Sequence, residues 1–231
     1  EHGLPVVGIP ATIDNDVGGT EYSFGFDSTV NIAMEAIDRI HTTAESHDRV
    51  MIIEVMGRLA GWIAVHAGVA GGADIILIPE QPIALQDVCD AIVRRHDRGK
   101  DFSIIVIAEG VRIADREKAA PVFQSVPADE FGQPRLGGIG QAVAREIEKR
   151  TGYDTRVTVL GHIQRGGSPT GFDRVLGSRF GVAAVDLVRA GRFGQCVALQ
   201  ANDIVPVPLA TAATRRTVPP ELYEMAKSFF G

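Results

Sequence analysis

The residues with the clearest potential for chemistry lie near the start of the chain. Residues 10–16 read Pro-Ala-Thr-Ile-Asp-Asn-Asp, and an apolar run over residues 4–9 leads into them. In an open α/β sheet, catalytic groups gather where a strand ends and a loop begins. Asp14 and Asp16, with the hydroxyl of Thr12 nearby, can supply a general base and a carboxylate beside a metal ion during phosphoryl transfer to an alcohol. The alternative is an Asx-rich turn whose side chains cap their own backbone.

Polar clusters of the same kind follow three further apolar runs. They are Gly57-Arg58, Glu109-Gly110 and residues 162–165, which begin with His162 and end with Arg165. Because each crossover in a parallel sheet returns the chain to the same side, we expect all four segments to line one edge of the sheet. Carboxylates, guanidinium groups and an imidazole at one edge indicate an anionic ligand that also carries hydroxyl groups.

Each of these residues also has a simpler interpretation. Arg58 can be a surface residue at a strand end, and Glu109 can be an acidic residue of an ordinary loop. Residues 165–168, Arg-Gly-Gly-Ser, can form a plain turn, although N–H groups beside an arginine and ahead of a helix make a good anion site. His162 has no second ligand at a metal-binding spacing, which argues against zinc.

The elements that position these residues alternate between strands and helices. Strands are expected over 4–9, 50–56, 74–78, 103–108, 155–160 and 196–200, and helices over 27–40, 60–71, 85–98, 137–150, 173–190 and 221–230. This alternation predicts an α/β fold with mainly parallel sheets and helices on both faces. Asp27 and Asp173 are the expected N-caps of their helices. Residues 111–135 and 205–220 are punctuated by proline and expected to be irregular, the first as a functional or mobile loop.

The composition of the 231 residues allows one large domain or two small ones with a substantial core. A formal net charge of −6 argues against a general nucleic-acid-binding surface. Cys89 and Cys196 lie far apart in apolar contexts, which favours buried thiols in a reducing compartment. No apolar run has the length of a membrane span and no signal peptide precedes the first strand, so a cytoplasmic location without membrane partners is expected. The chain begins at Glu1 without a methionine, which suggests that a segment upstream is missing.

Three segments together resemble the signature sequences of the 6-phosphofructokinase family of bacterial type. They are residues 10–16, residues 56–58 (Met-Gly-Arg) and residues 160–167 (Leu-Gly-His-Ile-Gln-Arg-Gly-Gly). The likeness runs from Val6 to about Gln200. It implies a Rossmann-like two-domain phosphofructokinase fold, of which this chain holds the carboxyl-terminal two thirds without the amino-terminal nucleotide-binding part.

The resemblance also implies a division into domains. Residues 1–25 and 164–195 would belong to the larger, donor-binding domain. Residues 26–163 would form the smaller domain that binds the sugar phosphate, and residues 196–231 a carboxyl-terminal extension.

The reaction that the resemblance implies is phosphoryl transfer from ATP to the 1-hydroxyl of fructose 6-phosphate, with Mg²⁺, giving fructose 1,6-bisphosphate in glycolysis. By position, Asp14 would be the general base and Thr12 would help to hold the transferring phosphoryl group. Asp16 would be a supporting carboxylate on the metal side, and Arg58 would stabilise the developing phosphoryl charge.

Further positions correspond to the sugar-phosphate site of the family. Met56 and Gly57 would shape the sugar pocket, Glu109 would bind sugar hydroxyls, and His162 and Arg165 would hold the 6-phosphate. Two more arginines come from the neighbouring subunit in the family, and Arg49 and Arg156 occupy those positions. The resemblance therefore implies a homo-oligomer, at least a dimer and usually a tetramer, and an allosteric enzyme whose effector site would lie near Asp74 and His41.

The phosphoryl donor depends on a departure from the family pattern. Ala11 stands where family members carry glycine, which accompanies ATP, or lysine, which often accompanies pyrophosphate. Alanine has no ammonium group, so ATP is favoured and a pyrophosphate-dependent enzyme is the alternative. A non-catalytic sugar-phosphate-binding module is the alternative of another class. A nicotinamide-dependent dehydrogenase is disfavoured because no G-x-G-x-x-G follows an early strand.

Overall fold

The computed structural model describes residues 3–46, 48–82, 84–114 and 137–230. Most of the expected loop 111–135 lies outside these residues. The elements, in chain order, are β1 (Val7–Gly8), α1 (Phe26–Glu45), β2 (Val50–Val55), α2 (Trp62–Ala70), β3 (Ile75–Leu77), α3 (Leu85–Asp97), β4 (Ser103–Ala108), α4 (Ile139–Thr151), β5 (Thr155–Val159), the 3₁₀ helix η1 (Gly161–Arg165), α5 (Gly171–Arg189), β6 (Gln195–Gln200), β7 (Asp203–Pro208), α6 (Leu209–Ala212) and α7 (Pro220–Lys227).

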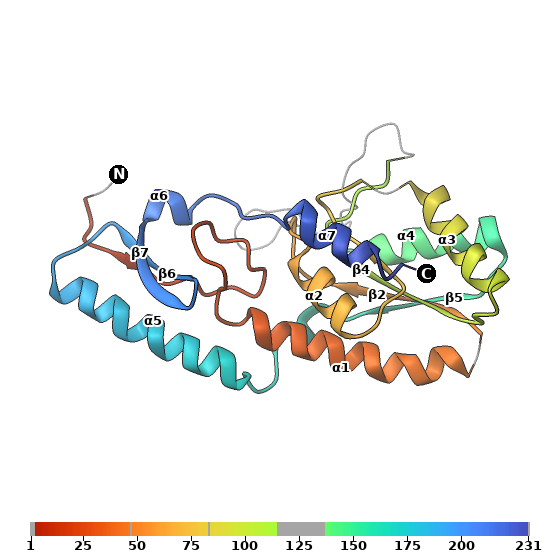
Figure 1. The fold of residues 1–231 in the computed structure, drawn as a ribbon, viewed down its shortest axis with the longest axis horizontal. Helices are drawn as coiled ribbons and strands as arrows, with labels where there is room; N and C mark the ends of the chain where they lie inside the picture. Colours follow the sequence, from red (N-terminus) through yellow and green to blue (C-terminus); the bar gives the residue numbers. More distant parts are fainter. Residues whose placement is uncertain (1–2, 47, 83, 115–136, 231) are drawn as a thin grey trace.

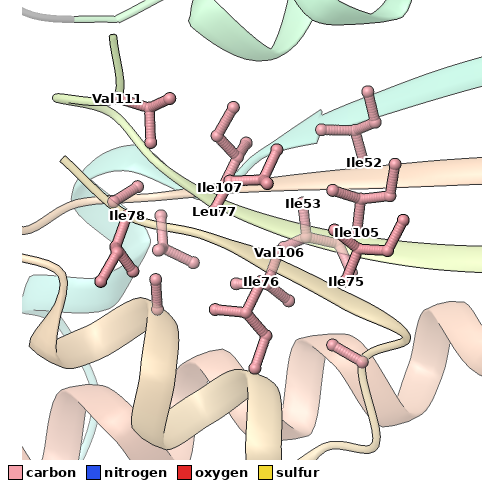
Figure 2. Packing of buried hydrophobic residues seen from close by; sticks show 14 of the residues in the cluster. Ile52, Ile53, Ile75, Ile76, Leu77, Ile78, Ile105, Val106, Ile107 and Val111 are labelled. Carbon is pink, nitrogen blue, oxygen red and sulfur yellow. The ribbon is translucent and has the colours of Figure 1, made fainter. Parts of the chain in front are cut away.

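The larger sheet is parallel and has the strand order β3-β4-β2-β5. Every residue of β2 and β4 is buried, as expected for central strands that are covered on both faces. Helices α1 and α2 lie on one face, and α3 and α4 lie on the other (Figure 1). Figure 2 shows the aliphatic core between these layers, in which Ile53, Val106 and Ile76 come from neighbouring strands. The expected α/β fold with a parallel sheet is confirmed.

The smaller sheet has the order β1-β6-β7, and α5 packs against it. The expected strand over residues 4–9 is wrong in length, because β1 pairs with β6 over Val7 and Gly8 alone. Strand β7 runs antiparallel to β6, and its residues 205–208 lie in the segment 205–220 that was predicted to be irregular. Ala201 and Asn202 make the tight turn with φ values of 46° and 75°.

The prolines of β7 explain why no strand was predicted over residues 205–208. Proline cannot donate to a strand ladder, so it is restricted to edge strands. Pro206 and Pro208 are compatible with β7 because β7 is the edge of its sheet. Strands β6 and β7, from the expected carboxyl-terminal extension, thus complete the smaller sheet, while Tyr223 and Ala226 of α7 belong to the core of the larger one.

The N-caps of α1 and α5 differ from those expected. Asp173 does not cap its own helix α5; the Thr170 hydroxyl does so by accepting from the backbone N–H of Asp173. The Asp173 carboxylate instead accepts from the backbone N–H groups of Gly25 and Ser28, both at 2.8 Å, and so caps α1 in place of Asp27. Asp27 accepts from the Thr170 hydroxyl. The N-termini of α1 and α5 lie side by side, so the carboxylate of each helix accepts hydrogen bonds from the start of the other.

No helix among the described residues combines the length and the apolar character needed to cross a membrane.

Candidate active site

The loop over residues 10–25, called the aspartate loop below, is held by Asn15. This residue has a left-handed backbone with φ of 54° and is buried. Its side-chain oxygen accepts from the N–H of Ser23 at 3.0 Å, and its amide donates to the carbonyl of Glu21 at 3.2 Å. Ser23 in turn donates to the carbonyl of Thr12 at 2.7 Å. Side chains of this cluster therefore do cap their own backbone, as the simpler interpretation expected, through Asn15 and through the Thr12 hydroxyl, which accepts from the N–H of Asp14.

Asp14 is buried, whereas its neighbour Asp16 is half-buried. Asp14 is 6% exposed, and its Oδ1 has no hydrogen-bond partner among the described residues. Burial raises the pKa of Asp14, and the charge of Asp16 raises it further, while Arg165 and Arg58 act in the opposite direction. A buried carboxylate with a raised pKa beside two guanidinium groups is a strong candidate for a general base.

The turn after β2 places Arg58 against the end of β4. Gly57 and Arg58 have φ values of 132° and 51°, and the N–H of Arg58 donates to the Glu109 carboxylate at 3.0 Å. A Cβ atom on Gly110 would lie 1.9 Å from the Arg58 carbonyl oxygen, so only glycine allows this approach. Burial raises the pKa of Glu109 although the Arg58 N–H lowers it, and Asp14 and Glu54 add to the rise.

The 3₁₀ helix η1 is fixed by Gln164, a residue to which the sequence assigned no role of its own. Gln164 is 1% exposed, and its side-chain oxygen accepts from the N–H of Met56 at 2.8 Å. Its carbonyl accepts from the Thr29 hydroxyl at 2.9 Å. His162 and Arg165, on either side of Gln164, are exposed. The position of Gln164 inside the 160–167 motif was the only sequence signal for this role.

The four polar segments converge, but not along one edge of one sheet. That expectation is wrong, because β1 belongs to the smaller sheet while β2, β4 and β5 belong to the larger. Asp14 nevertheless lies close enough to Asp16, Arg58, Arg165 and Glu109 for their charges to act on one another. The site is therefore formed between two sheets.

Arg49 and Arg156 lie away from this cluster. They stand at the amino ends of β2 and β5, whereas Arg58 follows the carboxyl end of β2. Six residues of strand separate the two ends, roughly 20 Å at about 3.3 Å per residue. Both arginines bind Asp154, at 2.7 Å from Arg49 and 2.9 Å from Arg156. Within one chain they cannot join the site around Asp14.

Comparisons with known proteins show which family the chain belongs to. The sequence profile of the family described as phosphofructokinase matches residues 1–188. The chain belongs to the phosphofructokinase family. It is 54% identical to the pyrophosphate–fructose 6-phosphate 1-phosphotransferase of Streptomyces coelicolor, and 51% identical to the ATP-dependent 6-phosphofructokinase of Mycobacterium tuberculosis. Each match takes in 100% of this chain and 67% of the relative, so the chain spans about two thirds of these relatives' length.

Solved phosphofructokinase structures share the fold. A phosphofructokinase structure from Saccharomyces cerevisiae has 33% sequence identity and a TM-score of 0.77, over 98% of this chain and 27% of that chain. A pyrophosphate-dependent phosphofructokinase from Marinobacter aquaeolei has 26% identity and a TM-score of 0.73, over 94% of this chain and 55% of that chain. The family and the fold class predicted from the signature segments are confirmed. The donor is not settled by similarity, because relatives of nearly equal identity carry both names.

The acidic residues of this phosphofructokinase chain fit Mg²⁺ when it is shared with a substrate. No group of three or more His, Cys, Asp or Glu side chains that could hold a metal ion occurs in the described part of the chain. Mg²⁺, however, is usually held by one or two carboxylates together with substrate phosphates and waters. Asp16 is half-buried beside Asp14 and offers such a carboxylate.

Proposed function

We propose that this chain transfers the terminal phosphoryl group of ATP to the 1-hydroxyl of fructose 6-phosphate, as part of a complete phosphofructokinase. The observation that carries the proposal is the buried Asp14 carboxylate, with one oxygen unpartnered among the described residues and with Arg58 and Arg165 nearby. Such a group needs an incoming donor, and a substrate hydroxyl supplies one.

The proposed step moves one proton and one phosphoryl group. Asp14 accepts the proton of the 1-hydroxyl while that oxygen forms a bond to the terminal phosphorus, and the bond to the bridging oxygen breaks to release ADP. Thr12 already accepts from the N–H of Asp14 at 3.2 Å, so its own O–H is left to donate to a phosphoryl oxygen. Arg58 stabilises the charge that develops on the transferring group. Mg²⁺ held in part by Asp16 would neutralise charge on the donor phosphates.

The sugar phosphate is positioned from the larger sheet. Glu109 accepts hydrogen bonds from sugar hydroxyls, and Met56 and Gly57 form the wall of the pocket. His162 and Arg165 bind the 6-phosphate, in keeping with their exposed side chains. These residues need to orient the substrate rather than react with it, because in-line phosphoryl transfer depends mainly on positioning and charge.

A second copy of the chain completes the site in this proposal. Asp154 holds Arg49 and Arg156 side by side at the far end of the larger sheet, where the Arg156 side chain is 56% exposed. Two adjacent guanidinium groups suit a phosphate that belongs to a neighbouring subunit. We propose that the homo-oligomer is at least a dimer. Cys89 and Cys196 are buried free thiols, which supports a reducing compartment such as the cytoplasm.

The proposed domain division places β1 and α5 with the donor-binding part and residues 26–163 with the sugar-phosphate part.

The pyrophosphate-dependent reaction is the second candidate, favoured by the 54% identity to a relative that bears this name. In that case phosphate, not ADP, leaves.

The deciding experiment is a coupled assay of the complete protein with fructose 6-phosphate and Mg²⁺, given ATP or pyrophosphate separately. Turnover with ATP supports the proposal. Turnover with pyrophosphate alone means that pyrophosphate, not ATP, is the phosphoryl donor. If neither donor supports turnover while fructose 6-phosphate still binds by calorimetry, the non-catalytic module becomes the correct description.

A further inference from the structure

A short segment near the end of the chain crosses between the two sheets. Residues 214–218, called the C-terminal strap below, join α6 beside the smaller sheet to α7 beside the larger one (Figure 1). The strap pairs with the aspartate loop: the N–H of Gly18 donates to the Thr214 carbonyl, and the N–H of Arg216 donates to the Asp16 carbonyl, both at 2.8 Å. It therefore acts as a short antiparallel strand along the segment that carries Asp14.

The side chain of Arg216 extends this pairing. Its Nη1 donates to the Glu21 carbonyl at 2.8 Å and lies 3.5 Å from the Asn15 carbonyl. The guanidinium carbon lies 3.9 Å from the ring centroid of Trp62, and the indole N–H donates to the Arg216 carbonyl at 3.4 Å. The guanidinium of Arg216 thus donates to the aspartate loop through Nη1, and its plane lies over the ring of Trp62, the first residue of α2.

The other end of the strap is fixed at the same helix start. Glu80 accepts from the N–H of Val218 at 3.1 Å and from the N–H of Gly61 at 3.0 Å. Helix α2 begins at Trp62, four residues after Arg58. The strap therefore links the loop that carries the proposed base to the helix that follows the proposed phosphoryl-binding arginine.

We infer that Arg216 is a positioning residue, which sets Asp14 relative to Arg58 across the two sheets. The inference rests on the proposed function, because the two groups must act on one phosphoryl transfer. They come from different sheets, so their spacing depends on the contacts that join the sheets. Catalytic groups displaced by about 1 Å can lose on the order of 100-fold in rate. A planar guanidinium can stack on the indole and donate along its edge, which a lysine ammonium cannot do.

The test compares Arg216→Met and Arg216→Lys in the complete protein, with Arg215→Met as the matched control. Arg215 is exposed, and its side chain makes no hydrogen bond or ion pair among the described residues. Arg216→Met should lower kcat at least 10-fold and change KM for fructose 6-phosphate less than twofold, because the groups proposed to bind the sugar phosphate are untouched. The kcat of Arg216→Lys should lie between those of Arg216→Met and the unchanged protein. Arg215→Met should have the kcat and KM of the unchanged protein.

Two readouts separate positioning from general destabilisation. The first is a fall in kcat of Arg216→Met without a matching rise in KM for fructose 6-phosphate, because a looser aspartate loop displaces Asp14 and leaves the groups proposed to bind the sugar phosphate in place. Hydrogen–deuterium exchange of residues 15–21 should accelerate in that variant and not in Arg215→Met. If Arg216→Met fails to fold, Trp62→Phe gives a milder test, because it keeps a ring under the guanidinium but removes the indole donor. It should show a smaller loss of kcat and a smaller acceleration of exchange.

The outcomes distinguish this inference from the proposed function. If the unchanged protein uses neither donor, the proposed function fails, and exchange at residues 15–21 still reports whether Arg216 orders the loop. If the unchanged protein is active but Arg216→Met matches Arg215→Met in kcat, KM and exchange, the inference is overturned.

Discussion

The cap that joins α5 to α1 gives the sharpest prediction for stability. Asp173 is 4% exposed, and its two carboxylate oxygens accept from the backbone N–H groups of Gly25 and Ser28 at 2.8 Å. One oxygen also accepts from the Ser28 hydroxyl at 2.5 Å. The Asp173→Ala substitution removes the acceptor for both N–H groups and leaves the start of α1 without its cap.

The size of the effect follows from these contacts. A hydrogen bond to a charged group contributes about 1.5–3 kcal/mol, and loss of an N-cap costs about 0.5–2 kcal/mol. Taking the lower value for each of the two backbone bonds, Asp173→Ala should reduce the free energy of unfolding by about 3 kcal/mol. Urea unfolding followed by circular dichroism measures this difference, with the m-value checked for constancy.

Asp186 on the same helix is the matched control. Its carboxylate is exposed and lies 3.9 Å from Arg189, so Asp186→Ala should change the free energy of unfolding by less than about 0.5 kcal/mol. If Asp173→Ala and Asp186→Ala unfold at the same urea concentration, the conclusion that Asp173 caps α1 is refuted.

The remaining predictions concern catalysis. Asp14→Asn should lower kcat by about 100- to 10,000-fold and change fructose 6-phosphate affinity by calorimetry only a few-fold, since it removes the base and not the sugar contacts; preserved turnover would reject the base. Burial and the charge of Asp16 raise the pKa of Asp14. As the pH is lowered, kcat should therefore begin to fall at a higher pH than the pH at which an exposed aspartate takes up its proton. Asp16→Asn should move that acid limb to lower pH, and an unmoved limb would show that Asp14 is not the titrating group. Arg165→Ala should weaken fructose 6-phosphate binding about 10- to 100-fold, and an unchanged affinity would remove it from the phosphate site.

Much of the larger sheet could be predicted from local sequence. The strand over residues 103–108 agrees with β4 at both ends, and the 50–56 run agrees with β2 to within one residue. Buried parallel strands are continuous apolar runs, so their signal is contained within the strand itself. The smaller sheet was predicted less well. Strand β1 is limited by its partner β6, which lies almost 190 residues later in the chain (Val7 opposite Gln195), and β7 contains prolines that only an edge position accommodates.

For the site, the sequence by itself determined which groups are available: Asp14, Arg58, Glu109 and the polar residues of η1. Residue type and proximity to strand ends carried that information. Only the tertiary structure decided that Asp14 lies near Arg58 although the two follow strands of different sheets, and that Arg49 and Arg156 lie at the opposite end of β2 and β5. It also decided the contacts of Gln164 and Arg216, whose partners are distant in sequence. A local pattern can specify burial and chain direction, but contacts between distant segments depend on how the sheets and helices pack together.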